Sequence, residues 1–162
     1  MSPMSWNELE LAAPEIAGPG RARLVETRVA LLATLRRDGS PRISPIEPYF
    51  TERHLLFGAM AWTLKARDLE RDARCTLHSA VSGSDAGELE LKLYGRAVDA
   101  DDGLRAACSE GWWIGKPRDS ACVFWLDIDE AVFVTWDYEA GDMTLRRWSR
   151  KAGVRTTRRA YP

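Results

Sequence analysis

Hydrophobic residues along the chain are grouped in short runs of strand length. The runs at 29–35 ("VALLATL") and 54–60 ("HLLFGAM") are nearly continuous, whereas 88–98 ("ELELKLYGRAV") alternates leucines with charged residues. A continuous apolar run is typical of a buried strand, and alternation indicates a strand with one face in water. Two further runs, at 75–81 and 121–136, extend the pattern. The sequence therefore predicts a protein built mainly from strands.

Turn residues connect some of these strands into hairpins. The Asp-Gly turn in "RRDGS" joins the run at 29–35 to an extended segment at 41–50 ("PRISPIEPYF"), and "DYEAGD" joins 121–136 to a strand at 143–148. The segment at 41–50 contains three prolines, which cannot donate a hydrogen bond to a neighbouring strand. We expect it at an edge of the sheet, or facing something other than a strand, such as a ligand.

Helical patterns occur mainly at the start of the chain. Residues 5–16 predict a short amphipathic helix with Ser5 as its cap and an end near Pro14. The sequence "GPG" at 18–20 then predicts a break before a second helical turn at 21–27.

Two further short helices are expected between strands. Trp62, Ala66, Leu69 and Ala73 are spaced to form one apolar helix face, and a short helix is predicted at about 101–109.

Closely spaced strands with only peripheral helices favour an antiparallel barrel over a parallel α/β sheet. The 162 residues suit a single domain. We expect an N-terminal helical arm at 1–27, the barrel at 28–149 and a basic C-terminal tail at 150–162. The simplest interpretation of the tail is a disordered, solvated end, and contact with an anionic substrate or with a partner's phosphate site is the alternative.

Composition excludes several classes of protein. The chain is 45% hydrophobic and 29% charged, with no apolar run near the roughly 20 residues of a membrane span and no secretory signal, so we expect a cytoplasmic protein away from membranes. Its three cysteines form no C-x-x-C or Cys/His pattern, which predicts free thiols and no metal site. A net charge of −1 gives no overall basic surface for nucleic acid.

Common catalytic motifs are absent from the sequence. The chain has no G-x-G-x-x-G after a strand, no phosphate-binding P-loop and no G-x-S-x-G. Its two histidines, His54 and His78, have no nucleophile or second ligand at a recognisable spacing. An enzyme built on this chain would need a cofactor to supply its chemistry.

One stretch has the features of a phosphate-binding site. Small residues, Gly58 and Ala59, end a strand, and Thr63 and Lys65 begin the following helix. Cations at a helix N-terminus are unfavourable unless an anion is nearby. Ala66 stands where a capping box would place Glu, so the first N–H groups of the helix are not satisfied from within.

The segments "LLATLRRDGSPRISPI", "HLLFGAM", "TLKARDLERDARCTLHS" and "LKLYGRAV" together resemble the pyridoxamine 5'-phosphate oxidase-like, FMN-binding split-barrel family over about residues 25–148. The resemblance implies that Arg42, Thr63 and Lys65 hold the flavin phosphate. The residues implied in cofactor binding are Arg42, Ile43, Ser44, Pro45, Phe57, Gly58, Ala59, Thr63, Leu64, Lys65, Trp136 and Arg146.

The same resemblance implies a homodimer with the cofactor between subunits. Trp136 and Arg146 are similar in position to a Trp and an Arg that approach the flavin from the partner subunit in the true oxidases. Those oxidases also have an Arg-x-His pair here, whereas this chain reads "DMTLRR". Oxidation of pyridoxine 5'-phosphate itself is therefore not expected.

These observations together predict an FMN-dependent oxidoreductase that acts on a small molecule, with Ser44 or backbone N–H groups near the flavin N5 and Arg146 near its pyrimidine edge. Two alternatives remain: a deazaflavin-dependent reductase of the same fold, and a non-catalytic module for flavin or haem, with His78 as the first candidate haem ligand. Loops at 82–87 and 110–118 are expected to set the substrate.

Overall fold

The structure is a computed structural model that describes residues 2–81 and 89–160, so the predicted substrate loop at 82–87 lies outside the described residues. The described strands form one antiparallel sheet, ordered β2-β1-β5-β6-β7-β4-β3, with β8 paired to β7 and β9 to β8. The strands are β1 (Ala30–Leu35), β2 (Pro41–Ile46), β3 (Pro48–Phe50), β4 (Leu55–Met60), β5 (Arg74–Ser79), β6 (Leu89–Asp99), β7 (Ala121–Asp137), β8 (Asp142–Ser149) and β9 (Gly153–Ala160).

The order of the strands shows that the sheet curls back on itself. Its two ends, β2 and β3, are separated in sequence by the single residue Glu47, so the first and last strands of the series must meet there. Among the described strands β2 pairs only with β1, and β3 only with β4. The predicted antiparallel split barrel is therefore confirmed, with the split beside Glu47 and β2 at an edge, as its prolines indicated.

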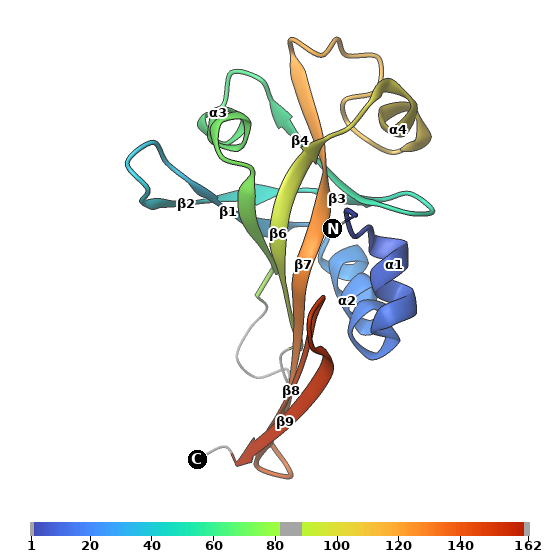
Figure 1. Cartoon of the computed structure of the whole chain (residues 1–162), viewed down its shortest axis with the longest axis vertical. Helices are drawn as coiled ribbons and strands as arrows, with labels where there is room; N and C mark the ends of the chain where they lie inside the picture. Colours follow the sequence, from blue (N-terminus) through green and yellow to red (C-terminus); the bar gives the residue numbers. More distant parts are fainter. Residues whose placement is uncertain (1, 82–88, 161–162) are drawn as a thin grey trace.

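Strand β7 is the longest strand and joins the barrel to an extension. Its first residues pair with β4 and its last with β8, while β6 pairs along its other edge. The β6–β7 register shifts at Gly95, where a Cβ would lie 2.0 Å from the Asp127 carbonyl oxygen. Only glycine fits this approach. Figure 1 shows β8 and β9 projecting at the end of the molecule opposite α3 and α4.

Helices α1 (Trp6–Ala12) and α2 (Pro14–Thr27) lie against one side of the sheet (Figure 1). Ser5 caps α1 in a reciprocal capping box with Glu8, as predicted for Ser5. The predicted break at 18–20 is wrong, because this stretch continues α2.

Packing explains why α2 runs through its glycines and proline. One side of the helix is buried in the core through Ile16, Ala17 and Leu24, and Pro14 occupies the first turn, where a missing N–H costs little. Burial of this face outweighs the cost of roughly 3 kcal/mol for Pro19 inside the helix.

The main core lies between these helices and the inner face of the sheet. Its largest fully buried side chains include Trp6, Phe57 and Phe133. A smaller cluster, formed around Trp113, Leu56 and Val123, lies beneath α4 (Asp102–Ala107) and the loop that follows it.

Helix α3 (Leu64–Arg71) starts later than the apolar spacing predicted. Ala66 and Leu69 are buried as expected, but Trp62 is 70% exposed because it precedes the cap at Thr63 and is outside the helical repeat. The predicted apolar face is thus wrong for Trp62 and for Ala73, which follows the C-cap at Asp72.

The C-terminal tail is also more ordered than its composition suggested. Gly153–Ala160 forms β9 along β8, so a disordered end is the wrong interpretation of these residues. Arg150, only 10% exposed, donates to the Ile128 carbonyl and pairs with Asp129 and with Asp127. Charged side chains are common on exposed edge strands, which explains how a basic segment forms a strand.

Within the described residues, every helix is too short or too polar to cross a membrane.

Candidate functional site

The split in the barrel is bridged by a lysine. Lys65 lies in the first turn of α3, directly after β4, and its Nζ donates to the Pro45 carbonyl oxygen of β2 at 2.8 Å. The side chain is partly buried, and this burial lowers its pKa, while the Glu47 carboxylate acts in the opposite direction. An ammonium that has lost part of its hydration favours a nearby anion.

Arg42 on β2 is held from one side by helix α3. Its Nε donates to Asp68 Oδ2 at 2.7 Å, and Asp68 is 3% exposed. Among the described residues, no hydrogen bond or ion pair engages the two terminal amino groups of Arg42. These groups therefore form a fork that is available to an anion.

Asp68 collects donors from three elements. Besides Arg42, it accepts from Thr34 Oγ1 of β1 at 3.1 Å and from Arg71 Nη2 of α3 at 3.1 Å. Burial alone would raise its pKa, but the hydrogen bonds from Arg42, Arg71 and Thr34 hold that pKa below its usual value. Asp68 thus stays ionised at neutral pH.

Thr63 serves as the cap of α3. Its Oγ1 accepts from the Ala66 N–H at 3.4 Å and donates to the Met60 carbonyl at 2.7 Å. The hydroxyl proton is therefore already used, and its role toward a phosphate stays a prediction. The N–H groups of Leu64 and Lys65 have no helical carbonyl four residues before them, so they point out of the helix start.

A cavity of about 470 Å³ lies in the split. It is lined by Val29, Pro45, Ile46, Glu47, Gly58, Ala59, Met60, Lys65 and Trp112. Four residues predicted from the sequence, Pro45, Gly58, Ala59 and Lys65, are therefore brought together. The other predicted residues of these segments do not line this cavity: Arg42, Ile43 and Ser44 on β2, Phe57 on β4, Thr63 at the cap of α3, and Leu64 on α3.

The pairing of β2 identifies which backbone groups face the split. Pro45 turns its carbonyl away from β1 toward Lys65, and backbone groups alternate sides along a strand, so Ile43 points the same way. Pro45 has no N–H, which leaves Ile43 as the donor on this edge. Ser44 pairs with the buried Leu32 and is half-buried, and its role near the flavin N5 stays a prediction.

Five lining residues, Val29, Ile46, Glu47, Met60 and Trp112, were not among the predicted cofactor residues, although Trp112 lies in the loop at 110–118 that was expected to set the substrate. Trp112 packs on Gly58, where a Cβ would lie 2.9 Å from its ring and 2.7 Å from that of Trp113. The only sequence signal was the "GWWIGKP" loop, since contacts between a distant loop and β4 leave no local pattern.

Trp136 and Arg146 are not near the split in the same chain. They lie on the β7–β8 extension, at the end of the molecule opposite α3 (Figure 1), and line a separate cavity of about 470 Å³. Their contact with a cofactor stays a prediction that requires a second subunit.

His78, the candidate haem ligand, lies on β5 with its Nδ1 2.6 Å from the Ser79 carbonyl oxygen. It lines neither the cavity in the split nor the one on the extension. In the described part of the chain, no cluster of three or more His, Cys, Asp or Glu is arranged for a metal ion.

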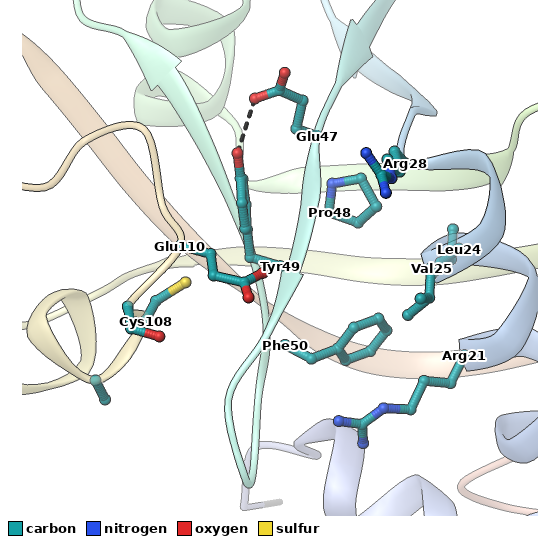
Figure 2. A pocket seen from close by; sticks show the side chains of 12 residues that line it. Arg21, Leu24, Val25, Arg28, Glu47, Pro48, Tyr49, Phe50, Cys108 and Glu110 are labelled. Atoms are coloured by element: carbon teal, nitrogen blue, oxygen red, sulfur yellow. Dashed lines mark hydrogen bonds between the residues drawn. The ribbon is translucent and has the colours of Figure 1, made fainter.

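A larger cavity of about 630 Å³ lies on the other side of Glu47, between α2, β3 and the loop after α4 (Figure 2). Tyr49 donates to Glu47 Oε2 at 2.9 Å, and burial together with this hydrogen bond raises the pKa of Tyr49 to about 12. Arg21 stacks over Phe50 at 4.6 Å from the ring centre. None of the predicted cofactor residues lines this cavity, but it shares Glu47 with the split.

Comparison with protein families matches residues 20–134 to pyridoxamine 5'-phosphate oxidase. Together with the split barrel, this match shows that the chain belongs to the pyridoxamine 5'-phosphate oxidase-like family. No curated protein sequence matches the chain significantly.

Solved structures share the fold at low sequence identity. PhzG from Burkholderia lata 383, in complex with tetrahydrophenazine-1-carboxylic acid, has a TM-score of 0.64 and 17% identity, covering 94% of this chain and 91% of that one. A pyridoxamine 5'-phosphate oxidase-related, FMN-binding protein from Nostoc punctiforme has a TM-score of 0.58 and 15% identity, covering 95% and 96%. A haem-binding protein from Mycobacterium smegmatis has a TM-score of 0.57 and 17% identity, covering 86% of each chain.

Proposed function

We propose that this protein is an FMN-dependent oxidoreductase that binds the flavin phosphate between β2 and α3. The observation that supports this most strongly is the pair of cations at the split. Among the described residues, the two terminal amino groups of Arg42 have no partner, and partly buried Lys65 has one carbonyl partner. Both are donors suited to a phosphate monoester.

The residues of the split fit a flavin in their chemistry. Arg42, Lys65 and the first N–H groups of α3 would hold the phosphate. The backbone of Gly58 and Ala59 and the indole of Trp112 would exclude water beside the ring, and the Ile43 N–H would donate to its polar edge. When bound, FMN supplies hydride transfer, and the side chains supply binding and orientation.

The proposal includes a homodimer. Gly58 at the split pairs with Val123 of β7, whereas Arg146 pairs with Phe133, ten residues further along the same strand (133 − 123). Trp136 and Arg146 would therefore complete the site of a second subunit. Exposed apolar side chains near the split, Ile43 and Leu64, at 68% and 55% exposure, favour coverage by a partner. Arg146 would then stabilise a reduced, anionic flavin.

The substrate of this oxidoreductase would be a small molecule, and the protein would work in the cytoplasm without nucleic acid or membrane. The described cysteines, Cys75, Cys108 and Cys122, are free thiols, as is common in a reducing compartment.

Two other cofactors are alternatives for the same fold. A deazaflavin would place a longer anionic tail on the cations of the split. A haem module is suggested by the haem-binding neighbour. His78, however, points its Nδ1 at a backbone carbonyl and lies outside the split cavity, so the residues at the split favour a flavin.

The test is cofactor titration of the purified protein, followed by steady-state assays. We expect saturable quenching of FMN fluorescence, weaker binding of a deazaflavin and of haem, and oxidation of a nicotinamide or other donor by the FMN-loaded dimer. Preferential haem binding, with a Soret shift lost in His78→Ala, would contradict the flavin proposal. FMN binding without turnover for any donor would instead support a non-catalytic module.

A further inference from the structure

Asp68 joins three separate elements at the back of the cation pair. It lies within α3, is nearly inaccessible to solvent, and accepts hydrogen bonds from Thr34 on β1 and from Arg42 on β2. A buried carboxylate is costly unless donors and cations surround it, and here Arg42 and Arg71 supply both. The Asp68 carboxylate thus connects helix α3 to the edge strand β2 and to its neighbour β1.

The way Asp68 holds Arg42 leaves a particular part of the guanidinium accessible. The hydrogen bond uses Nε, on the side of the group nearest the helix. The two terminal amino groups remain, and their planar fork matches the oxygen atoms of a phosphate. Without this contact, an arginine on an edge strand would sample many rotamers.

We propose that Asp68 is a positioning residue for the phosphate site: it fixes the Arg42 guanidinium so that its terminal amino groups point to the phosphate shared with Lys65. This inference rests on the proposed function, since it concerns the phosphate of the same flavin. Arg71, which also donates to Asp68 and to the Leu35 carbonyl, holds the carboxylate in place from the solvent side.

The charges around the site predict the opposite effect of an Asp68 substitution on phosphate binding from the effect that a positioning role predicts. Arg42, Lys65 and Arg71 carry three positive charges, and Asp68 and Glu47 carry two negative charges, so the cluster has a surplus of one positive charge. Replacing Asp68 with a neutral residue raises this surplus to two. Coulomb attraction alone would then strengthen phosphate binding, whereas loss of positioning weakens it.

The experiment compares FMN with riboflavin, which has the same ring and ribityl chain but no phosphate. We expect Asp68→Asn to raise the dissociation constant for FMN at least tenfold and to change that for riboflavin less than twofold. The matched control is Asp72→Asn, which removes the same charge at the C-cap of α3, where the carboxylate pairs with Arg74. This control should leave both constants within twofold of wild type.

Several results would overturn the inference. If Asp68→Asn binds FMN as tightly as wild type, or more tightly, the gain in positive charge outweighs any loss of Arg42 orientation. An equal loss of affinity for FMN and for riboflavin would show that Asp68 has a general structural role. If Asp68→Asn does not fold, Thr34→Val removes one donor to Asp68 without changing any charge, and an unchanged FMN preference in that variant would refute the inference. A wild-type protein that binds FMN no better than riboflavin would refute the proposed phosphate site itself.

Discussion

Replacing Lys65 with alanine tests the split site by removing one cation and little else. The ammonium has three hydrogens, and one of them is directed at the Pro45 carbonyl oxygen, 2.8 Å away. The other two are available to a phosphate. A hydrogen bond to a charged group contributes roughly 1.5–3 kcal/mol, and about 1.4 kcal/mol corresponds to a tenfold change in affinity. We therefore expect Lys65→Ala to weaken FMN binding about 10- to 150-fold.

The partial burial of Lys65 favours a loss of FMN affinity near the upper end of that range. Because burial lowers the pKa of Lys65, its charged form is poorly compensated in the free protein, and an anion restores part of the lost hydration energy. A partly buried charge is also less screened by salt than an exposed one. The loss on mutation should thus persist at 0.15 M salt.

The assay is titration of FMN by fluorescence quenching, at low and at physiological ionic strength. Arg67→Ala is the matched control, because Arg67 lies on the same helix, is exposed and has no side-chain hydrogen bond or ion pair in the described chain. It removes the same charge two residues away and should change FMN affinity less than twofold. Thermal unfolding of both variants establishes that they are folded.

Equal losses in Lys65→Ala and Arg67→Ala would refute the reasoning, because they would show a general electrostatic attraction rather than a defined contact. No loss in Lys65→Ala would show that the phosphate lies elsewhere.

Three further measurements address pH, packing and the N-terminal helices. Above about pH 7, where the phosphate monoester is a dianion, affinity for FMN should be constant and then fall as the pH rises through the lowered pKa of Lys65. Lys65→Arg should keep its affinity there, and a decline shared by both proteins would contradict this assignment. Gly58→Ala should lower the free energy of unfolding in urea by about 1–3 kcal/mol, because the new Cβ would lie 2.7 Å from Trp113, and no change would show that the tryptophans move freely. Trp6→Ala should cost about 3–5 kcal/mol in the same assay, since its side chain is fully buried in the main core, and a cost below 1 kcal/mol would mean that α1 is dispensable.

Much of the barrel was predictable because strands carry local signals. The continuous apolar run in β4 is buried up to Met60, and the alternation in β6 reflects which face is buried. The similar run in β1 was expected to be buried throughout, but its burial alternates and Leu31 is 36% exposed. The prolines of β2 exclude it from the middle of a sheet. The predicted hairpins, β1–β2 and β7–β8, are confirmed.

The sequence predictions that were wrong concern segments whose structure is decided by tertiary contacts. The "GPG" stretch stays helical because α2 packs on the sheet, and the basic tail becomes a strand because β8 offers it a free edge. Neither contact leaves a pattern in its own segment. Local propensity is a weak guide wherever distant packing decides.

The candidate site was predictable only in part. A hydroxyl and a lysine at a helix start indicated an anion, and the resemblance added Arg42. The contribution of Asp68 could not be read from the sequence, because an aspartate on a charged helix is usually solvated. The loop at 110–118 was expected to shape the site, but the contact of its Trp112 with β4 was not predictable, since the two are more than fifty residues apart in the chain.

The most direct test of the central claim is the ratio of the dissociation constants for riboflavin and FMN, measured in wild type and in the double variant Arg42→Ala/Lys65→Ala. If these two cations hold the phosphate, wild type should prefer FMN by at least about a hundredfold, on the basis of two charge-assisted contacts, and the double variant should lose that preference. A double variant that retains the wild-type preference for FMN would contradict the assignment of the phosphate site to β2 and α3.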